Sequence, residues 1–426
     1  MPSAPPYSPR VVDAELEEHL TGLAAVALEG AKGVGKTRTA MQRARTVVQL
    51  DDPAQRDLVL ADPGRALRGP TPVLVDEWQH VPSTWDAVRR AVDAGAAPGS
   101  FLLAGSAVPR DSGVHSGAGR IVRLRMRPMT LAERGVARPT VSLAGLLSGR
   151  RPAVAGTTAV GLDEYAEEIC RSGLPAIRSL PPRLRRAQLD GYVDRIIDRD
   201  FPDLGRAVRN PAPLRRWMTA YAAAESTTTA YDRLLEAATP GEQDKPAKTT
   251  TTAYRDVLER LWFLDPVPAW TPSRNHLTRL AAAPKHHLAD PAFAARLLGV
   301  DADALAGAAP ARGAGREATL LGQLFESLVT LDVRVHAQAA EARTGHLRLR
   351  GGNHEVDLVV ERGDGKVLAL EVKLAGTVTD ADVKHLHWLR ETLGDDVLDA
   401  VVVTAGTDAY RRRDGIAVVP AALLGP

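Results

Sequence analysis

The sequence is poor in cysteine, in net charge and in long apolar runs. Cys170 is the only cysteine among 426 residues, which excludes an internal disulfide and a cysteine-based metal cluster. The formal net charge is only +2, so any contact with nucleic acid must come from a local patch. No apolar run reaches the roughly 18 residues that a membrane-spanning helix needs. The opening "MPSAPPYSPR" lacks the apolar stretch of a secretory signal, and together these absences favour a reducing cytoplasm.

The remaining composition is that of a globular protein with more than one domain. Hydrophobic residues make up 44% of the chain and charged residues 25%, both ordinary values. The length predicts two or three domains. Changes in composition and periodicity place the domains at residues 1–146, 147–310 and 311–426, with a Pro- and Gly-punctuated linker at 147–161.

The first part of the chain alternates short apolar runs with helical patterns. Residues 23–30, 71–79 and 99–107 are typical of buried strands, and "TWDAVRRAVDAG" between the last two is typical of a helix. Strands that alternate with helices predict a parallel sheet covered by helices on both faces. The expected fold class here is therefore α/β.

A glycine-rich loop follows the first of these strands. The stretch "EGAKGVGKTRTA" carries the spacing G-x-x-x-x-G-K-[ST], with the Lys at position 36. Backbone N–H groups between a strand and a helix can bind phosphates, a Lys here can reach the β- and γ-phosphates, and the following hydroxyl can bind Mg²⁺. A Gly-rich turn with a surface Lys is the alternative. The predicted nucleotide-binding residues are Gly30, Ala31, Lys32, Gly33, Val34, Gly35, Lys36 and Thr37.

Acidic and polar residues end the next two predicted strands. Asp76 could hold Mg²⁺ together with Thr37, and Glu77 could polarise the attacking water. The alternative is an acidic pair that caps a helix. Ser106 ends the following strand and would lie beside the γ-phosphate if the two strands are neighbours. A strand-terminal Ser without a role is equally compatible with the pattern.

Four arginines follow in "GRIVRLRMRP". Arg120 is the candidate that could reach the γ-phosphate of a neighbouring subunit, because Gly117 and Gly119 before it make its loop mobile. Such an Arg stabilises charge in the transition state. For the others, Arg123, Arg125 and Arg127, a solvent-facing strand is the simpler interpretation.

The middle of the chain is mainly helical. Helices followed by the apolar segment "LWFLDPVPAW" resemble a winged-helix unit, in which Arg255 and Arg260 would face DNA. The apolar positions of the same helix, Tyr254, Val257, Leu258 and Leu261, equally fit a buried face, and a protein-binding or autoinhibitory role is the alternative. His286 and His287 lack acidic or cysteine partners at ligand spacing, so a strand-edge pair is expected rather than a metal site.

A predicted hairpin near the C-terminus brings carboxylates and a Lys together. Asp357 lies on its first strand, and Glu371 and Lys373 lie on one face of the second. Glu326, on the preceding helix, could add a carboxylate. Two or three carboxylates with a Lys are what metal-dependent phosphodiester cleavage requires, with Glu326, Asp357 and Glu371 holding Mg²⁺. A surface Glu–Lys pair is the alternative.

These motifs together resemble a known group. Residues 8–135, through "LEGAKGVGKT", "VLVDEWQ" and "FLLAGSA", are similar to prokaryotic AAA+-type P-loop ATPases that carry a C-terminal domain of unknown function. "RSGLP", "YVDRIIDRDF" and "KHHLADPAFAARLLG" extend this resemblance through the middle. The hairpin resembles a restriction-endonuclease-like core, written D…(D/E)-x-K, although Val356 stands where that motif has Pro. Ser106 stands where the AAA+ sensor favours Asn or Thr.

The resemblance implies ATP and Mg²⁺ as cofactors, with ATP hydrolysis coupled to a nuclease-like module. The alternative is an ATP-dependent switch whose nuclease-like domain is inactive and binds protein or DNA. DNA, a protein partner and further copies of the chain are the candidate partners, and no membrane is expected. The full expected fold is a P-loop NTPase parallel sheet, a helical winged-helix-like middle domain and a C-terminal restriction-endonuclease-like α/β module.

Overall fold

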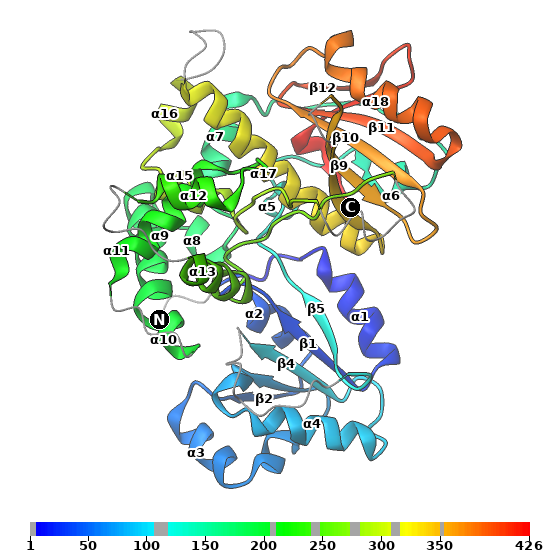
Figure 1. Cartoon of the computed structure of the whole chain (residues 1–426). Helices are drawn as coiled ribbons and strands as arrows, with labels where there is room; N and C mark the ends of the chain where they lie inside the picture. Colours follow the sequence, from blue (N-terminus) through cyan, green and yellow to red (C-terminus); the bar gives the residue numbers. More distant parts are fainter. Residues whose placement is uncertain are drawn as a thin grey trace.

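The structure is a computed structural model of the whole chain. It describes residues 6–105, 118–204, 210–239, 248–272, 282–307, 316–349 and 353–426, and every statement below concerns these. In Figure 1 an α/β part (blue to cyan) lies below a helical part (green) and a second α/β part (orange to red). The long yellow helix α17 runs between the two upper parts.

The N-terminal part is built on a five-stranded sheet of order β2-β3-β4-β1-β5. All of its strand pairs are parallel, which confirms the predicted parallel sheet. Residues of β3 and β4 are buried on both faces, as expected where helices cover a parallel sheet. The strands are β1 (Ala25–Glu29), β2 (Thr46–Gln49), β3 (Val73–Asp76), β4 (Phe101–Gly105) and β5 (Val122–Arg125).

Helices on both faces of this sheet form two apolar clusters, one around Leu16 and one around Trp85. Asp52 caps α3 by accepting the backbone N–H of Ala54, and Pro53 occupies its first turn. The helices and helical turns of this part are α1 (Val12–Gly22), α2 (Lys36–Met41), α3 (Pro53–Ala61), η1 (Pro63–Leu67), η2 (Trp78–His80), α4 (Ser83–Asp93) and α5 (Leu131–Arg134).

The helical part confirms the mainly helical character expected of the middle of the chain, but a winged helix is not confirmed. Val257 and Leu258 of α13 are buried, so this helix contributes to the core. Beyond it the chain forms isolated bridges, Leu264 with Leu288 and Val267 with Lys285. The elements are α7 (Leu162–Arg171), α8 (Pro175–Arg178), α9 (Pro182–Arg195), the π-helical turn η3 (Ile196–Asp200), α10 (Phe201–Asp203), α11 (Pro211–Ala223), α12 (Tyr231–Ala237), α13 (Lys248–Arg260), α15 (Pro291–Leu297) and α16 (Ala302–Gly307).

The C-terminal part contains a seven-stranded mixed sheet of order β7-β12-β13-β11-β10-β9-β8. The predicted hairpin is present: β9 and β10 are antiparallel, with Leu370 opposite Leu358. A restriction-endonuclease-like core is not established by this topology and stays a prediction. The elements are α17 (Arg316–Ala339), β8 (Arg343–Arg348), β9 (Glu355–Glu361), β10 (Val367–Lys373), α18 (Asp380–Leu393), η6 (Gly394–Asp396), β11 (Val397–Thr404), β12 (Asp408–Arg411), β13 (Ala417–Pro420), η7 (Ala421–Leu423) and β14 (Leu424–Gly425).

The stretch after the N-terminal sheet belongs structurally to the C-terminal part. β6 (Val141–Ser142) pairs with β14, and β7 (Gly156–Thr157) pairs with β12. Between them, α6 (Leu143–Leu147) contacts β10 and β11. Part of the expected linker therefore forms the edge of the C-terminal sheet. After the N-terminal sheet the chain first runs along the C-terminal part and only then enters the helical part.

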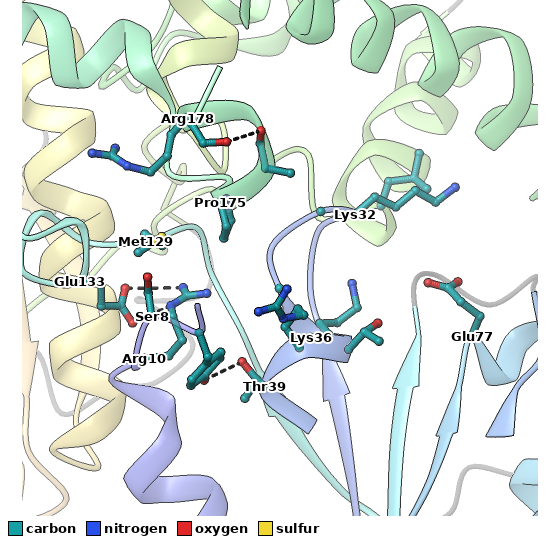
Figure 2. A pocket seen from close by; sticks show the side chains of 18 of the residues that line it. Ser8, Arg10, Lys32, Lys36, Thr39, Glu77, Met129, Glu133, Pro175 and Arg178 are labelled. Atoms are coloured by element: carbon teal, nitrogen blue, oxygen red, sulfur yellow. Dashed lines mark hydrogen bonds and ion pairs between the residues drawn. The ribbon is translucent and has the colours of Figure 1, made fainter. Parts of the chain in front are cut away.

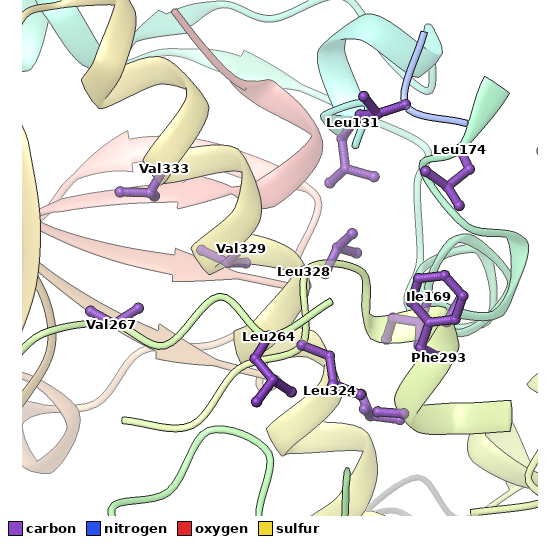
Figure 3. Close-up of a cluster of buried hydrophobic side chains, with 14 of the residues drawn as sticks. Leu131, Ile169, Leu174, Leu264, Val267, Phe293, Leu324, Leu328, Val329 and Val333 are labelled. Atoms are coloured by element: carbon purple, nitrogen blue, oxygen red, sulfur yellow. The ribbon is translucent and has the colours of Figure 1, made fainter. Parts of the chain in front are cut away.

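One continuous apolar cluster joins all of these regions around α17 (Figure 3). Leu324 and Leu328 of this helix lie among Ile169 and Phe293 of the helical part and Leu131 of the N-terminal part. Burying an aliphatic side chain contributes about 1.5–3 kcal/mol, so this shared cluster ties the regions firmly together. In the part of the chain that the structure describes, no helix combines the length and apolar character needed to cross a bilayer.

Candidate functional site

The glycine-rich loop lies at the carboxyl edge of the parallel sheet, between β1 and α2. Gly33 has φ of 76° and Gly35 has φ of 108°, values in the left-handed region that favours glycine. Gly30 has φ of 154°, and a Cβ there would collide with the backbone carbonyl of Met126. The loop conformation therefore depends on the glycines that the sequence motif places there.

Lys36 is almost completely buried in the loop. Its Nζ donates to the carbonyl oxygens of Gly30 (2.8 Å) and Ala31 (2.9 Å). Burial lowers the pKa of Lys36 to about 8, although the carboxylates of Glu77 and Asp76 act against this shift. A phosphate at the loop would offer this ammonium group stronger, charged acceptors than the carbonyls.

Thr37 and Asp76 meet beneath the loop. The Thr37 hydroxyl donates to Asp76 Oδ1 at 2.9 Å. Asp76 is 4% exposed, and burial raises its pKa to about 6. A hydroxyl and a carboxylate at this separation are hard oxygen ligands of the kind that Mg²⁺ prefers, so the pair fits that ion.

Glu77 follows directly after β3 with φ of 50°, an uncommon value for a residue with a side chain. Its carboxylate accepts a hydrogen bond from the Gln79 side chain. In Figure 2 the Glu77 side chain lies across the carboxyl edge of the sheet from Lys36. Both residues line the same cavity.

This cavity has a volume of about 1230 Å³, enough for a nucleoside triphosphate. Its walls come from several stretches of the chain that are far apart in sequence. Figure 2 shows Pro175 of the helical part beside the loop, and Met129 and Glu133 also line the cavity. The N-terminal segment contributes Pro6, Tyr7, Ser8 and Arg10. The loop and the residues after β2 and β3 contribute Lys32, Gly33, Gly35–Thr39, Asp51 and Glu77. The helical part contributes Arg171, Pro175, Arg178, Arg195 and Asp200.

Arg10 fixes the loop to the chain that leaves β5, a role that the sequence motif does not indicate. Its buried guanidinium donates to the carbonyls of Val34 and Arg127, each at 2.8 Å. It also pairs with Glu133 at 2.9 Å. Glu133 belongs to a capping box with Thr130, so the carboxylate is held in place by its own helix start.

The helical part also contacts the loop directly. Lys32 Nζ lies 2.5 Å from Asp200 Oδ1, and the Tyr192 hydroxyl donates to the Lys32 carbonyl at 3.2 Å. Asp200 ends the π-helical turn η3, a rare geometry that is often found at functional sites. The predicted phosphate-binding residue Lys32 is thus engaged by a carboxylate from another part of the chain.

The structure does not bring Arg120 to the glycine loop, and it gives no placement for the other predicted residue. Ser106 falls outside the described residues. Arg120 pairs with Asp93 at 2.8 Å and is half exposed. It precedes β5, so it lies at the amino edge of the parallel sheet, opposite the glycine loop. Arg120 is therefore too far from the loop of its own chain to contact a nucleotide there. It could contact only a nucleotide bound by a neighbouring subunit.

The arginines after Arg120 are not all solvent-facing, which corrects the simpler interpretation. Arg125 and Arg127 both pair with Asp265 of the helical part, at 3.0 and 2.9 Å. Arg334 of α17 pairs with the same carboxylate at 2.8 Å. This buried group joins all three regions of the chain.

The structure brings the C-terminal candidates together. Lys373 Nζ lies 3.1 Å from Glu371 Oε2. Asp357 Oδ2 accepts the backbone N–H of Val372 at 2.9 Å, which holds it beside the second strand. Lys285, which the sequence did not single out, lies 3.3 Å from Asp357 and 2.7 Å from Glu326.

Charge in this carboxylate cluster, Glu326, Asp357 and Glu371, is unevenly distributed. Burial raises the pKa of Glu371, and the neighbouring Asp357 charge adds to this shift. Burial also raises the pKa of Glu326, to about 8. Burial alone would raise the pKa of Asp357 too, but Lys285 and Lys373 hold it below its ordinary value. Within the described ranges, no group of three or more His, Cys, Asp or Glu side chains is arranged to hold a metal ion.

His286 and His287 are both buried. His286 Nε2 hydrogen-bonds the Thr229 carbonyl at 2.7 Å, and His287 Nδ1 lies 3.4 Å from Glu225. Burial lowers the pKa of both imidazoles, which keeps them neutral. Both histidines therefore contribute to the packing of the buried interior.

Comparisons with known proteins match three segments of the chain. Residues 24–134 match the model of an AAA domain, residues 162–304 match a domain of unknown function (DUF8612), and residues 321–424 match another (DUF4143). The AAA-domain match, on the segment with the glycine loop and the Asp76 strand, supports ATP binding and hydrolysis.

Related whole chains are known. Two uncharacterized proteins, from Mycobacterium bovis and Mycobacterium tuberculosis, are each 26% identical over 417 residues, covering 96% of this chain and 82% of theirs. A solved Walker-type ATPase of Pyrococcus abyssi is 12% identical with a TM-score of 0.31, covering 67% of this chain and 94% of its own.

Proposed function

We propose that this protein hydrolyses ATP with Mg²⁺ and couples hydrolysis to a C-terminal nuclease-like module. The observation that carries the hydrolysis proposal is the Thr37–Asp76 hydrogen bond beside the buried Lys36, at the edge of a large cavity. The AAA-domain match on the same residues supports it.

The roles of the residues follow from their positions. Backbone N–H groups of residues 30–37 and the Lys36 ammonium bind the phosphates, and Thr37 and Asp76 hold Mg²⁺. Bound Mg²⁺ supplies positive charge that offsets the charge developing on the phosphates. Glu77 orients and polarises the attacking water. Arg120 would act only in an assembly, on the nucleotide of a neighbouring subunit.

A steady-state ATPase assay tests this assignment. Lys36→Ala should lower turnover by about 100-fold or more, because one preorganised phosphate contact contributes about that much. Glu77→Gln should retain ATP binding and lose roughly 100-fold or more in turnover, as expected when a general base is removed. Lys384→Ala, an exposed Lys on α18, is the matched control. Unchanged turnover in Lys36→Ala would refute the assignment of the phosphate site. Normal turnover in Glu77→Gln would show that Glu77 does not polarise the attacking water.

The C-terminal module has two candidate roles. A nuclease-like role is supported by the meeting of Asp357, Glu371 and Lys373 on adjacent strands. A regulatory switch with an inert module is supported by Lys285, which lies where a metal ion would be expected. Plasmid nicking with Mg²⁺ and ATP separates them: loss of nicking in Glu371→Ala supports the first, and no nicking by a wild-type chain with intact ATPase activity supports the second.

A further inference from the structure

The tip of the glycine loop is held at two points by the helical part of the chain. Lys32 Nζ lies 2.5 Å from Asp200 Oδ1, and the Lys32 carbonyl accepts the Tyr192 hydroxyl at 3.2 Å. In Figure 2 Lys32 lies at the tip of the loop, beside helices of the helical part (green). One residue of the loop is therefore fixed through both its side chain and its main chain.

The two anchors come from one continuous helical stretch and are themselves well held. Tyr192 lies in the last turn of α9, and Asp200 ends η3, which follows α9 directly. The Tyr192 ring packs against Phe293 of α15, with the ring centroids 4.8 Å apart. The Asp200 side chain is 4% exposed, and Arg195 approaches it only to 3.8 Å. Because a buried carboxylate is costly without a paired cation, Lys32 is the partner that this position requires.

The main-chain anchor also sets the direction of the next N–H group. In a planar trans peptide unit, the C=O and N–H bonds point to opposite sides. Because Tyr192 holds the Lys32 carbonyl on the side of α9, the Gly33 N–H points to the other side. Gly33 lines the cavity, and its φ of 76° lies where glycine is permissive. A peptide unit next to such a glycine rotates easily unless a hydrogen bond holds it.

We propose that Tyr192 and Asp200 are positioning residues of the phosphate site, which hold the loop so that the Gly33 N–H already faces the position of a phosphate. The inference rests on the proposed ATP-binding function, because it takes residues 30–37 as the phosphate ligands. Lys32 then binds phosphate through the main chain of the loop, and its ammonium group binds the helical part. A donor that is aimed before binding loses little freedom when the ligand arrives, which raises affinity.

Tyr192→Phe tests the main-chain anchor, since it removes the hydroxyl and keeps the ring that packs against Phe293. Calorimetric titration of the full-length chain with ADP and Mg²⁺ should show about fivefold weaker binding, the effect of one hydrogen bond. Pyrophosphate, measured by competition with ADP, should bind more weakly by the same factor, because the anchor acts on the phosphate loop and not on the nucleoside.

Tyr165→Phe is the matched control. The Tyr165 hydroxyl accepts the backbone N–H of Ala422 at 2.9 Å, in the C-terminal part of the chain. This variant therefore also loses one buried hydrogen bond between a tyrosine and the main chain. It should bind ADP and pyrophosphate as wild type does, which separates positioning of the loop from a general loss of stability.

The side-chain anchor is tested by combining Lys32→Met with Asp200→Asn, two changes that together leave the net charge as in wild type. This double variant should also bind ADP and pyrophosphate about fivefold more weakly or worse, because the loop has lost its charged contact with η3. Asp198→Asn, at an exposed position of the same turn, should leave both affinities unchanged.

A second measurement needs no ligand. In the nucleotide-free chain labelled with ¹⁵N-glycine, the Gly33 N–H signal is identified by its loss in Gly33→Ala. Nuclear magnetic resonance relaxation of this signal should show greater mobility in Tyr192→Phe and in the double variant than in wild type. Tyr165→Phe should leave the mobility of Gly33 unchanged.

Three results would overturn the proposal. The first is wild-type affinity for ADP and pyrophosphate in Tyr192→Phe. The second is a Gly33 N–H that stays as rigid as in wild type in both test variants. The third is weaker binding of ADP that pyrophosphate does not share, because the hydroxyl would then act on the nucleoside. A wild-type chain that binds neither ligand would refute the proposed ATP site itself, and the Gly33 signal, which needs no ligand, distinguishes the two failures.

Discussion

Asp265 is the buried carboxylate that joins the three regions, and its replacement by asparagine should destabilise the whole chain. The carboxylate is 5% exposed and pairs with Arg125, Arg127 and Arg334 at 3.0, 2.9 and 2.8 Å. Burial alone would raise the pKa of Asp265, but the three guanidinium groups hold it well below its ordinary value. Because the folded-state pKa is depressed, this contribution is fully present above about pH 4 and is lost only as the pH falls further.

The expected size of the effect follows from this burial. Removing one partner of a buried ion pair costs about 3–5 kcal/mol, since the remaining charges stay buried without compensation. The unfolding entropy grows with chain length, so for 426 residues each kcal/mol changes the melting temperature by about 1 °C, which predicts a loss of roughly 3–5 °C for Asp265→Asn. The two side chains differ little in volume, so the change is electrostatic rather than steric.

Thermal unfolding followed by circular dichroism at pH 7.5 measures this effect. Asp190→Asn is the matched control, because Asp190 also pairs with an arginine, Arg296, but both side chains are partly exposed. Such surface pairs contribute about 1 kcal/mol or less, so the control should lose no more than about 1 °C. A melting temperature of Asp265→Asn within about 1 °C of the control would refute the claim that this group holds the regions together.

Two further predictions concern the glycine loop. The pKa of Lys36, lowered to about 8, must rise when a triphosphate binds, so binding should take up about three quarters of a proton at pH 8.5 and almost none at pH 6.5. Calorimetry in two buffers of different ionisation enthalpy measures this uptake, and identical heats at pH 8.5 would contradict it. Gly30→Ala should abolish nucleotide binding, whereas Gly191→Ala, where an added Cβ meets no atom within 4 Å, should bind normally and gain about 0.5–1 kcal/mol in stability. Equal binding by the two variants would show that the Met126 carbonyl does not constrain the loop.

The local pattern of the nucleotide site could be predicted because its parts are short-range. Strand, glycine turn and helix follow one another in sequence, so Lys36 and Thr37 are placed by neighbouring residues. Asp76 could be added because parallel strands end at the same edge of a sheet. The Arg10–Glu133 and Lys32–Asp200 pairs carry no such signal, since the two residues of each pair lie more than 100 positions apart in the chain.

The middle of the chain shows where periodicity is ambiguous. The sequence of the helix around Val257 and Leu258 has a polar side that is compatible with DNA binding and an apolar side that is compatible with burial in a core. The structure buries the apolar side, and Arg255 instead lies over the ring of Tyr231 at 4.7 Å. A hydrophobic stripe establishes that a helix packs against something, but it does not identify the partner.

The sequence by itself determined the strands, the glycine loop and the C-terminal hairpin, because each depends on residues close together in the chain. Only the tertiary structure decided what surrounds them. The helical part lines the nucleotide cavity, residues 156–157 pair with the C-terminal sheet, and Lys285 lies among the carboxylates. Those contacts depend on how one shared apolar cluster packs around α17. Packing of that kind is set by the combined shape of many distant side chains, which a linear pattern does not record.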